Sequence, residues 1–88
     1  MKKLVTVTEV EGEGLESLLG ERVLLLSMNY FYEGVLAGVN TDCVRLDDPH
    51  IVYETGKWNE KSYADRQKLH CPALYVRTNS IEAFGASK

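Results

Sequence analysis

The sequence is poor in the residues that mark disulfide-rich, secreted and membrane-spanning proteins. Its 88 residues contain only two cysteines, Cys43 and Cys71, which are too few for a disulfide framework. No apolar run approaches the roughly 18 residues that a membrane span needs. The first residues, MKKLVTVTEVEGEG, lack the apolar core of a signal peptide. We therefore expect a cytoplasmic protein that makes no contact with a membrane.

The spacing of cysteine and histidine does not indicate a metal site. Cys43 and His50 lie far apart in the sequence, whereas His70 and Cys71 are adjacent and would point to opposite faces of a strand. Neither arrangement is typical of zinc ligands. We expect no metal and no cofactor, with both thiols buried and both imidazoles exposed.

The residue combinations of common enzymes are also missing. No nucleophile–base pair, phosphate-binding loop or carboxylate dyad stands out in the chain. Asp47 and Asp48 precede Pro49, a combination more typical of a turn than of a metal-dependent active site. We predict that the protein is not an enzyme.

Charge is divided unevenly along the chain, whose net charge is −3. This balance disfavours a protein that coats nucleic acid by charge alone. The N-terminal quarter is acidic, whereas the stretch 57–70 interleaves aromatic and basic side chains. These side chains are Lys57, Trp58, Lys61, Tyr63, Arg66 and Lys68. Two interpretations of this stretch remain open: a nucleic-acid-binding surface, or a solvated loop whose aromatic residues cover the fold.

Short apolar segments separated by turn residues indicate a small β protein. A helix is predicted over 15–20, because Leu15, Leu18 and Leu19 share one helical face and Gly20 is a typical stop. Strands are predicted at 22–28 (buried on both sides), 29–40, 43–46, 73–76 and 81–84, with a further strand fragment at 51–54. Asp47-Asp48-Pro49 should interrupt the strand before it, because proline cannot donate to a ladder.

Two glycines inside the segment 29–40 suggest a sharp bend. Gly34 and Gly38 would weaken a flat sheet but suit the corner of a barrel. The sequence therefore predicts a mainly β fold, in which a short N-terminal helix precedes a five-stranded, strongly bent antiparallel small barrel. Residues 1–14 would form an N-terminal arm and residues 15–85 the barrel domain, with a variable loop at about 55–70.

Two motifs give the chain a resemblance to the Sm and LSm family over about residues 15–85. The first motif is carried by Gly34-Val35-Leu36, Asn40-Thr41-Asp42 and Leu46-Asp47-Asp48, and the second by Leu74-Tyr75-Val76-Arg77-Thr78-Asn79-Ser80-Ile81. The chain departs from the family at two positions. The Met-Asn pair that follows the family's first polar turn is missing, with Cys43 near its place and a turn one residue shorter. Thr78 replaces the glycine that follows the arginine.

The resemblance implies a homo-oligomeric ring of about five to seven subunits. In such rings the fourth strand of one subunit, here about 71–77, pairs with the fifth strand of the next, here about 80–84. Pairing of this kind would cover apolar edges that are prone to aggregation if left open.

The resemblance also implies that single-stranded RNA, often U-rich, or single-stranded DNA binds at the pore. Arg77 would stack on or contact a base, and Asn79 would help to shape its pocket. Asn40 would hydrogen-bond the base edge, with Thr41 or Asp42 beside it. The expected role is RNA processing or RNA chaperoning.

A second function stays open beside RNA binding. The acidic net charge and Thr78 also fit a structural or protein-interaction ring that has lost its affinity for RNA. In that case Arg77 would be solvated or would pair with a carboxylate of the neighbouring subunit, and Asn40, Thr41 and Asp42 would be plain turn residues.

Overall fold

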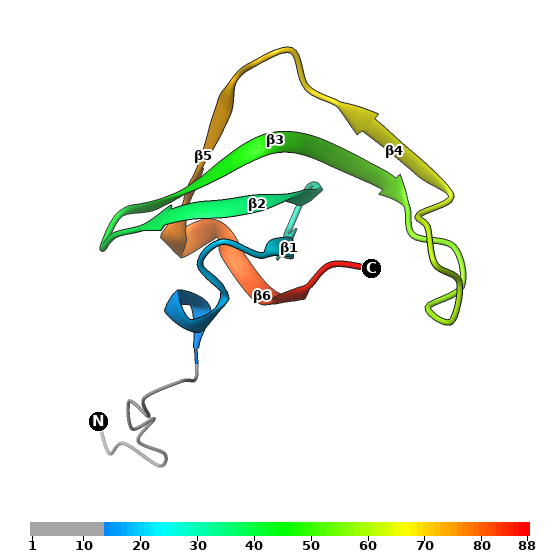
Figure 1. The fold of residues 1–88 in the computed structure, drawn as a ribbon, viewed down its shortest axis with the longest axis horizontal. Helices are drawn as coiled ribbons and strands as arrows, with labels where there is room; N and C mark the ends of the chain where they lie inside the picture. Colours follow the sequence, from blue (N-terminus) through cyan, green and yellow to red (C-terminus); the bar gives the residue numbers. More distant parts are fainter. Residues whose placement is uncertain (1–13) are drawn as a thin grey trace.

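The computed structural model describes residues 14–88, which form one antiparallel sheet of six strands with little helix (Figure 1). In chain order the elements are the 3-10 turn η1 (Leu15–Leu18), β1 (Arg22–Ser27), β2 (Phe31–Val39), β3 (Cys43–Glu54), β4 (Asp65–Lys68), β5 (Ala73–Arg77), the 3-10 turn η2 (Thr78–Ser80) and β6 (Ile81–Ala86). The prediction of a mainly β fold is confirmed. Of the predicted N-terminal arm, only Gly14 falls within the described residues.

The strand order is β4-β3-β2-β1-β6, and β5 also pairs with β3. The first half of β3, Cys43–Asp47, pairs with β5, and the second half pairs with β4. Both strands therefore lie along the same side of β3, whereas β6 lies at the far edge of the sheet beside β1 (Figure 1). Among the described strands β5 and β6 do not pair, so the sheet is not closed and the predicted barrel of five strands is not confirmed.

A continuous, bent β3 replaces the predicted break at Asp47-Asp48-Pro49, so that prediction is wrong. The register between β2 and β3 shifts here, because Glu33 lies opposite His50 and Val35 opposite Asp47. Asp48 and Pro49 are therefore accommodated in a bulge, and Asp48 adopts a φ of 48°. Pro49 still takes part in pairing through its carbonyl, which accepts from the Leu69 N–H at 2.9 Å. A bulge bends its strand and tolerates the missing N–H of proline.

Gly34 lies opposite this bulge, which explains why a glycine is needed there. A Cβ atom at Gly34 would lie 2.9 Å from the backbone oxygen of Asp47 and 3.2 Å from Leu46 Cβ. The first distance is shorter than real Cβ atoms show and the second is unusually tight, so β2 and β3 could not approach as closely with a larger residue. Of the two glycines, Gly34 is the one whose missing side chain lets the strands approach closely, and a second register shift lies between Leu36 and Gly38.

Two further sequence predictions differ from the structure. The stretch 55–70, expected to be a loop, contains β4, whose exposed residues continue the edge of the sheet beside β3. The predicted helix at 15–20 is a single 3-10 turn that ends before Gly20, at φ 88°. Leu15 and Leu18 pack on the core, as expected from the helical pattern, but Leu19 is half exposed. One turn is too short to build the hydrogen-bond ladder of an α-helix.

One face of the sheet carries the hydrophobic core, to which β1, β2, β3 and β5 contribute. Its buried members are Val23, Leu25, Leu36, Val44, Leu46 and Val76. Leu24 is also buried, although it points to the opposite face from Val23 and Leu25. The prediction that β1 is buried on both sides is therefore confirmed. In the part of the chain that the structure describes, no helix has the length and apolar character to cross a membrane.

The opposite face buries a carboxylate, that of Glu33, which is only 1% exposed. Arg22 binds it with two hydrogen bonds, from Nε at 2.7 Å and from Nη2 at 2.9 Å. Arg66 of β4 donates to the same carboxylate at 3.2 Å, and the Ser87 hydroxyl donates at 3.2 Å. A buried charge is tolerated only when its lone pairs are satisfied in this way. Glu33 thereby joins β1, β2, β4 and the residue after β6.

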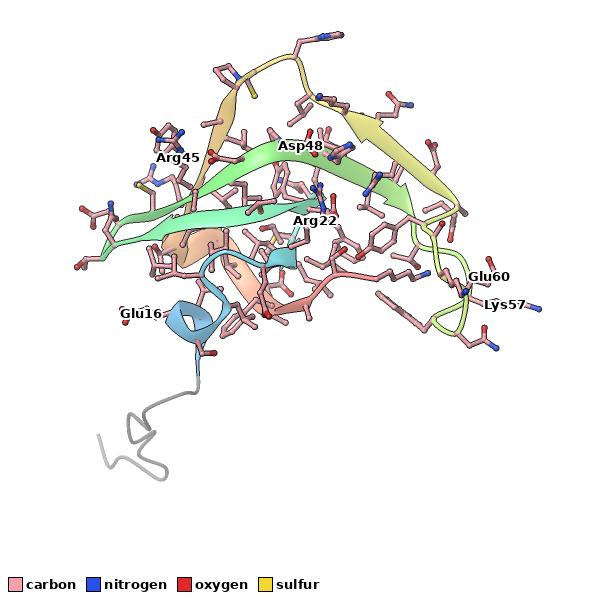
Figure 2. The ribbon with its side chains drawn as sticks, in the orientation of Figure 1. Glu16, Arg22, Arg45, Asp48, Lys57 and Glu60 are labelled. Atoms are coloured by element: carbon pink, nitrogen blue, oxygen red, sulfur yellow. The ribbon has the colours of Figure 1, made fainter. Side chains whose placement is uncertain are left out.

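His50 and Asp48 extend this charged cluster across the bend in β3. Asp48 accepts from Arg22 Nη1 at 3.0 Å and pairs with Lys68 at 3.3 Å, and Figure 2 shows Arg22 and Asp48 close together near the middle of β3. The His50 ring is only 8% exposed and has Nδ1 2.9 Å from the Asp48 carbonyl oxygen. The expectation of an exposed imidazole is therefore wrong for His50 and correct for His70, while both thiols are partly rather than fully buried.

The surroundings of Glu33 lower its pKa. Burial, the largest single effect, raises the pKa, but the hydrogen bonds from Arg22 and Ser87 and the charges of Arg22 and Arg66 together outweigh it. Because the pKa in the folded state is below the ordinary value of 4.5, the ionised carboxylate stabilises the fold at neutral pH. That contribution begins to fall when the pH drops below 4.5. It is lost once the pH has passed through the lowered pKa of the folded state.

Replacing Glu33 by glutamine should lower the free energy of unfolding at pH 7 by about 3 kcal/mol, because two guanidinium groups lose a buried counter-charge. The difference from the unaltered protein should shrink on acidification, and urea unfolding between about pH 3 and 7 measures it. Glu21→Gln, a change at an exposed side chain, serves as the control and should follow the unaltered protein. Parallel pH curves for the unaltered protein and the Glu33 variant would contradict this role.

Candidate nucleic-acid interface

The structure brings the two predicted binding turns together. One is the β2–β3 turn, Asn40 to Asp42, and the other is η2, Thr78 to Ser80. Pairing between β3 and β5 places Cys43 opposite Arg77, and the Thr78 N–H donates to the Asp42 carbonyl at 2.9 Å. The residues that the sequence analysis proposed therefore share one end of the sheet. Whether they bind nucleic acid stays a prediction.

Asn40 uses its side-chain oxygen to build the first turn. Oδ1 accepts from the backbone N–H of Asp42 at 2.9 Å and from that of Cys43 at 2.8 Å. This is the local bonding that makes asparagine a common turn residue. The amide NH₂ has no partner within residues 14–88, so it is the part of Asn40 that remains able to donate to a base. Thr41 and Asp42 are exposed beside it.

Arg77 differs from the other arginines of the chain in its electrostatic surroundings. Arg22, Arg45 and Arg66 all pair with carboxylates. Arg77 ends β5 with an exposed side chain, and no ion pair or side-chain hydrogen bond engages its guanidinium within the described part of the chain. A free, planar guanidinium at the end of a strand suits stacking on a splayed-out base.

The second turn tolerates Thr78 at the position where the resembling family has glycine. The backbone of Thr78 has a negative φ, so no glycine conformation is required. Ser80 Oγ donates to the Arg77 carbonyl at 2.8 Å and closes the turn, while Asn79 is exposed. The Thr78 hydroxyl itself is buried with no partner among residues 14–88. Threonine at this position therefore preserves the turn and adds a buried hydroxyl beside Arg77.

A hollow next to Asn40 contains two side chains that the sequence analysis missed. It has a volume of about 250 Å³, and among its lining residues are Asn40, Arg45 and Tyr75. Arg45 and Tyr75 lie opposite each other on β3 and β5, and Figure 2 shows Arg45 beside β5. Tyr75 is 61% exposed, as the alternation with Leu74 and Val76 indicates. The alternation predicts that the Tyr75 side chain faces away from the core. That Arg45 is its neighbour follows only from the register of β3 with β5.

The basic stretch 57–70 has little free charge to offer a nucleic acid. Arg66 and Lys68 pair with Glu33 and Asp48, which leaves Lys57 and Lys61 as the basic side chains of this stretch without an ion pair in the described region. This distribution favours the interpretation of 55–64 as a loop with structural contacts of its own over a second nucleic-acid-binding surface.

Comparisons with known proteins assign no family, since no protein-family model and no curated protein matches the chain. Within residues 14–88 no three His, Cys, Asp or Glu side chains gather in a way that would hold a metal ion. The features of the molecule that bear on its function are therefore the geometry of the two turns and the open edges of the sheet.

Replacing Asn40 by alanine should lower the free energy of unfolding by about 1 kcal/mol, because two backbone N–H groups lose their acceptor. Asn40→Asp keeps an acceptor oxygen and should restore most of that loss. Thr41→Ala, at an exposed position of the same turn, is the matched control. Urea unfolding measures all three. Equal stability of Asn40→Ala and the Thr41 control would show that the turn does not depend on this side chain.

Proposed function

We propose that the chain is the subunit of an Sm-like ring that binds single-stranded RNA, with a role in RNA processing or RNA chaperoning. The observation that carries this proposal is the meeting of two polar turns, Asn40 to Asp42 and Thr78 to Ser80, beside Arg77, whose side chain has no partner in residues 14–88. The arrangement offers one planar cation and several amide groups on one edge, which is the chemistry that reads unstacked bases. The proposed location is the cytoplasm.

The open edges of the sheet support the assembly of several copies. β5 and β6 are the strands that correspond to the predicted fourth and fifth strands of the family, and each pairs on one side only within the described sheet. Tyr75 on β5 and Phe84 on β6 are both large exposed hydrophobic residues, at 61% and 43% exposure. Pairing β5 of one copy with β6 of the next covers both edges, and repetition of this head-to-tail contact closes a ring of about five to seven copies.

The proposed RNA site forms where neighbouring copies meet. Arg77 ends the strand that would pair with the next subunit, so the arginines of all copies would line one rim of the pore. Repetition of a single weak base contact around the ring multiplies affinity, because each later contact is intramolecular. This accounts for RNA binding by a chain whose net charge is −3.

An interaction ring without RNA binding is the second candidate. The Asn40 side-chain oxygen is engaged in its own turn, and the Thr78 hydroxyl beside Arg77 is buried, so neither group is available to a base. In that function the rim would contact protein, and Arg77 would pair with a carboxylate. Both candidates predict a ring, so the subunit number cannot distinguish them. Titration with RNA can, because only the first candidate predicts binding.

Assembly should depend on the apolar edge of β6. Phe84→Asp places a charge where a neighbouring β5 would cover the edge, and we expect the ring to dissociate into smaller species, measured by native mass spectrometry. Met28→Asp, at an 86% exposed position outside the paired edges, should leave the subunit number unchanged. Circular dichroism verifies that both variants remain folded. A monomeric unaltered protein would contradict the ring itself.

RNA binding should depend on Arg77. Arg77→Ala should weaken the binding of a U-rich oligonucleotide by about tenfold or more, because a stacking contact is lost in every subunit. Arg77→Lys keeps the positive charge but lacks the planar guanidinium that stacks on a base, so it should recover little of the lost affinity. Lys61→Ala makes the same charge change on the 55–64 loop and should bind normally. Fluorescence anisotropy at two salt concentrations measures these affinities. An unaltered protein that forms a ring but ignores RNA would favour the interaction ring.

A further inference from the structure

Lys88 places its ammonium group against the loop between β3 and β4, residues 55–64. Nζ donates to three backbone carbonyl oxygens, those of Thr55 at 2.6 Å, Lys57 at 2.9 Å and Ser62 at 3.4 Å. Three carbonyl oxygens that converge on one nitrogen match the three N–H donors of a primary ammonium group.

Two aromatic rings complete the surroundings of this nitrogen. Nζ lies 5.2 Å from the centroid of the Trp58 ring and 5.0 Å from that of the Tyr63 ring, within the range of cation–π attraction. The Tyr63 hydroxyl is 2.8 Å from Ser87 Oγ, which fixes the orientation of its ring. We call this arrangement of three carbonyls and two rings the ammonium cage.

The loop holds the shape of the cage through its own contacts. Gly56 has a φ of +69°, and a Cβ atom there would lie 3.3 Å from Ala64 Cβ, so the two ends of the loop lie close together. The Glu60 N–H donates to the Lys57 carbonyl at 3.1 Å and closes a turn at the tip, where Figure 2 shows both residues. Every group of the cage except its occupant therefore comes from this folded loop, which is pre-organised for a cation.

No carboxylate among residues 14–88 forms an ion pair with Lys88. The direct partners of its ammonium group are carbonyl oxygens and ring faces. Such a site distinguishes cations by their shape and by the number of N–H donors that they direct at the three oxygens. A quaternary ammonium has no N–H to offer, and a planar guanidinium cannot direct three donors at three convergent oxygens.

We propose that loop 55–64 is a binding site for a primary alkylammonium group, such as the side chain of a lysine, and that Lys88 occupies it as a competing ligand from the same chain. The site is accessible: Trp58 is 62% exposed, and a hollow of about 520 Å³ adjoins the cage at Tyr63, Asp65 and Lys88. An external amine takes the place of the Lys88 ammonium when the Lys88 side chain leaves the cage, while Ser87 keeps its contacts with Tyr63 and Glu33.

The test uses Trp58, the only tryptophan of the chain, as a fluorescent reporter. Lys88→Ala empties the cage, and n-butylammonium, which reproduces the end of a lysine side chain, is titrated at constant ionic strength. We expect a saturable change in Trp58 emission, with an apparent affinity at least about tenfold higher than in the unaltered protein, where Lys88 competes at an effective concentration of the order of millimolar. Tetramethylammonium should bind more weakly than butylammonium.

The controls separate the cage from general cation binding. Lys61→Ala removes a lysine of the same loop and should respond like the unaltered protein. Nα-acetyl-lysine methylamide distinguishes the sources of the amine: binding equal to that of butylammonium indicates a lysine within a polypeptide, and weaker binding indicates a small free amine. Equal responses to butylammonium and tetramethylammonium, or no response of Lys88→Ala, would overturn the proposal.

A second measurement needs no substitution. In the unaltered protein the two ring currents should move the Lys88 Cε protons upfield in the NMR spectrum, and excess butylammonium should return them towards the position of a free lysine. Cε protons at the free-lysine position from the start would show that the cage does not hold an ammonium group in solution.

Discussion

The bulge in β3 at Asp48 and Pro49 decides where the other strands lie. A straight strand of this length would present one flat edge to a single neighbour, but the bent strand offers its first half to β5 and its second half to β4. The bend is possible because Gly34 leaves room for the β3 backbone at that point. The division of one edge of β3 between β5 and β4 depends on this local irregularity, and the β5 half of that edge is where the two polar turns meet.

Glu33 stabilises the bend on the face opposite the core. Its carboxylate receives hydrogen bonds from Arg22, Arg66 and Ser87, which belong to three different segments of the chain. Burial destabilises the charged carboxylate and the two arginines stabilise it, so the loss of either arginine would leave part of the cost of burial uncompensated. A network of this kind specifies one arrangement of strands more strictly than apolar contacts do, because a shifted register would leave a buried charge unpaired.

Alternation and turn residues were sufficient to predict β1, β2, β5 and β6, and to place Asn40 and Arg77 at strand ends. They failed at β3, because proline ends a regular strand but can be accommodated in a bulge, and here the bulge lies opposite Gly34. They also failed at β4, an exposed strand whose polar residues carry no apolar signal. The pairing of Tyr75 with Arg45 and the charges around Glu33 depend on register between distant segments, which local patterns do not contain.

The pairing of β1 with β6 has a consequence for how the chain folds. β1 occupies residues 22–27 and its partner β6 residues 81–86, so the last strand of the sheet closes the longest loop. Contacts between residues so distant in sequence slow folding, because the entropy of loop closure must be overcome first. Until β6 is available, the apolar edge of β1, from Val23 to Leu26, remains unpaired. Aggregation during synthesis should therefore begin at β1, and early pairing of β1 with β2 limits the exposure to one edge.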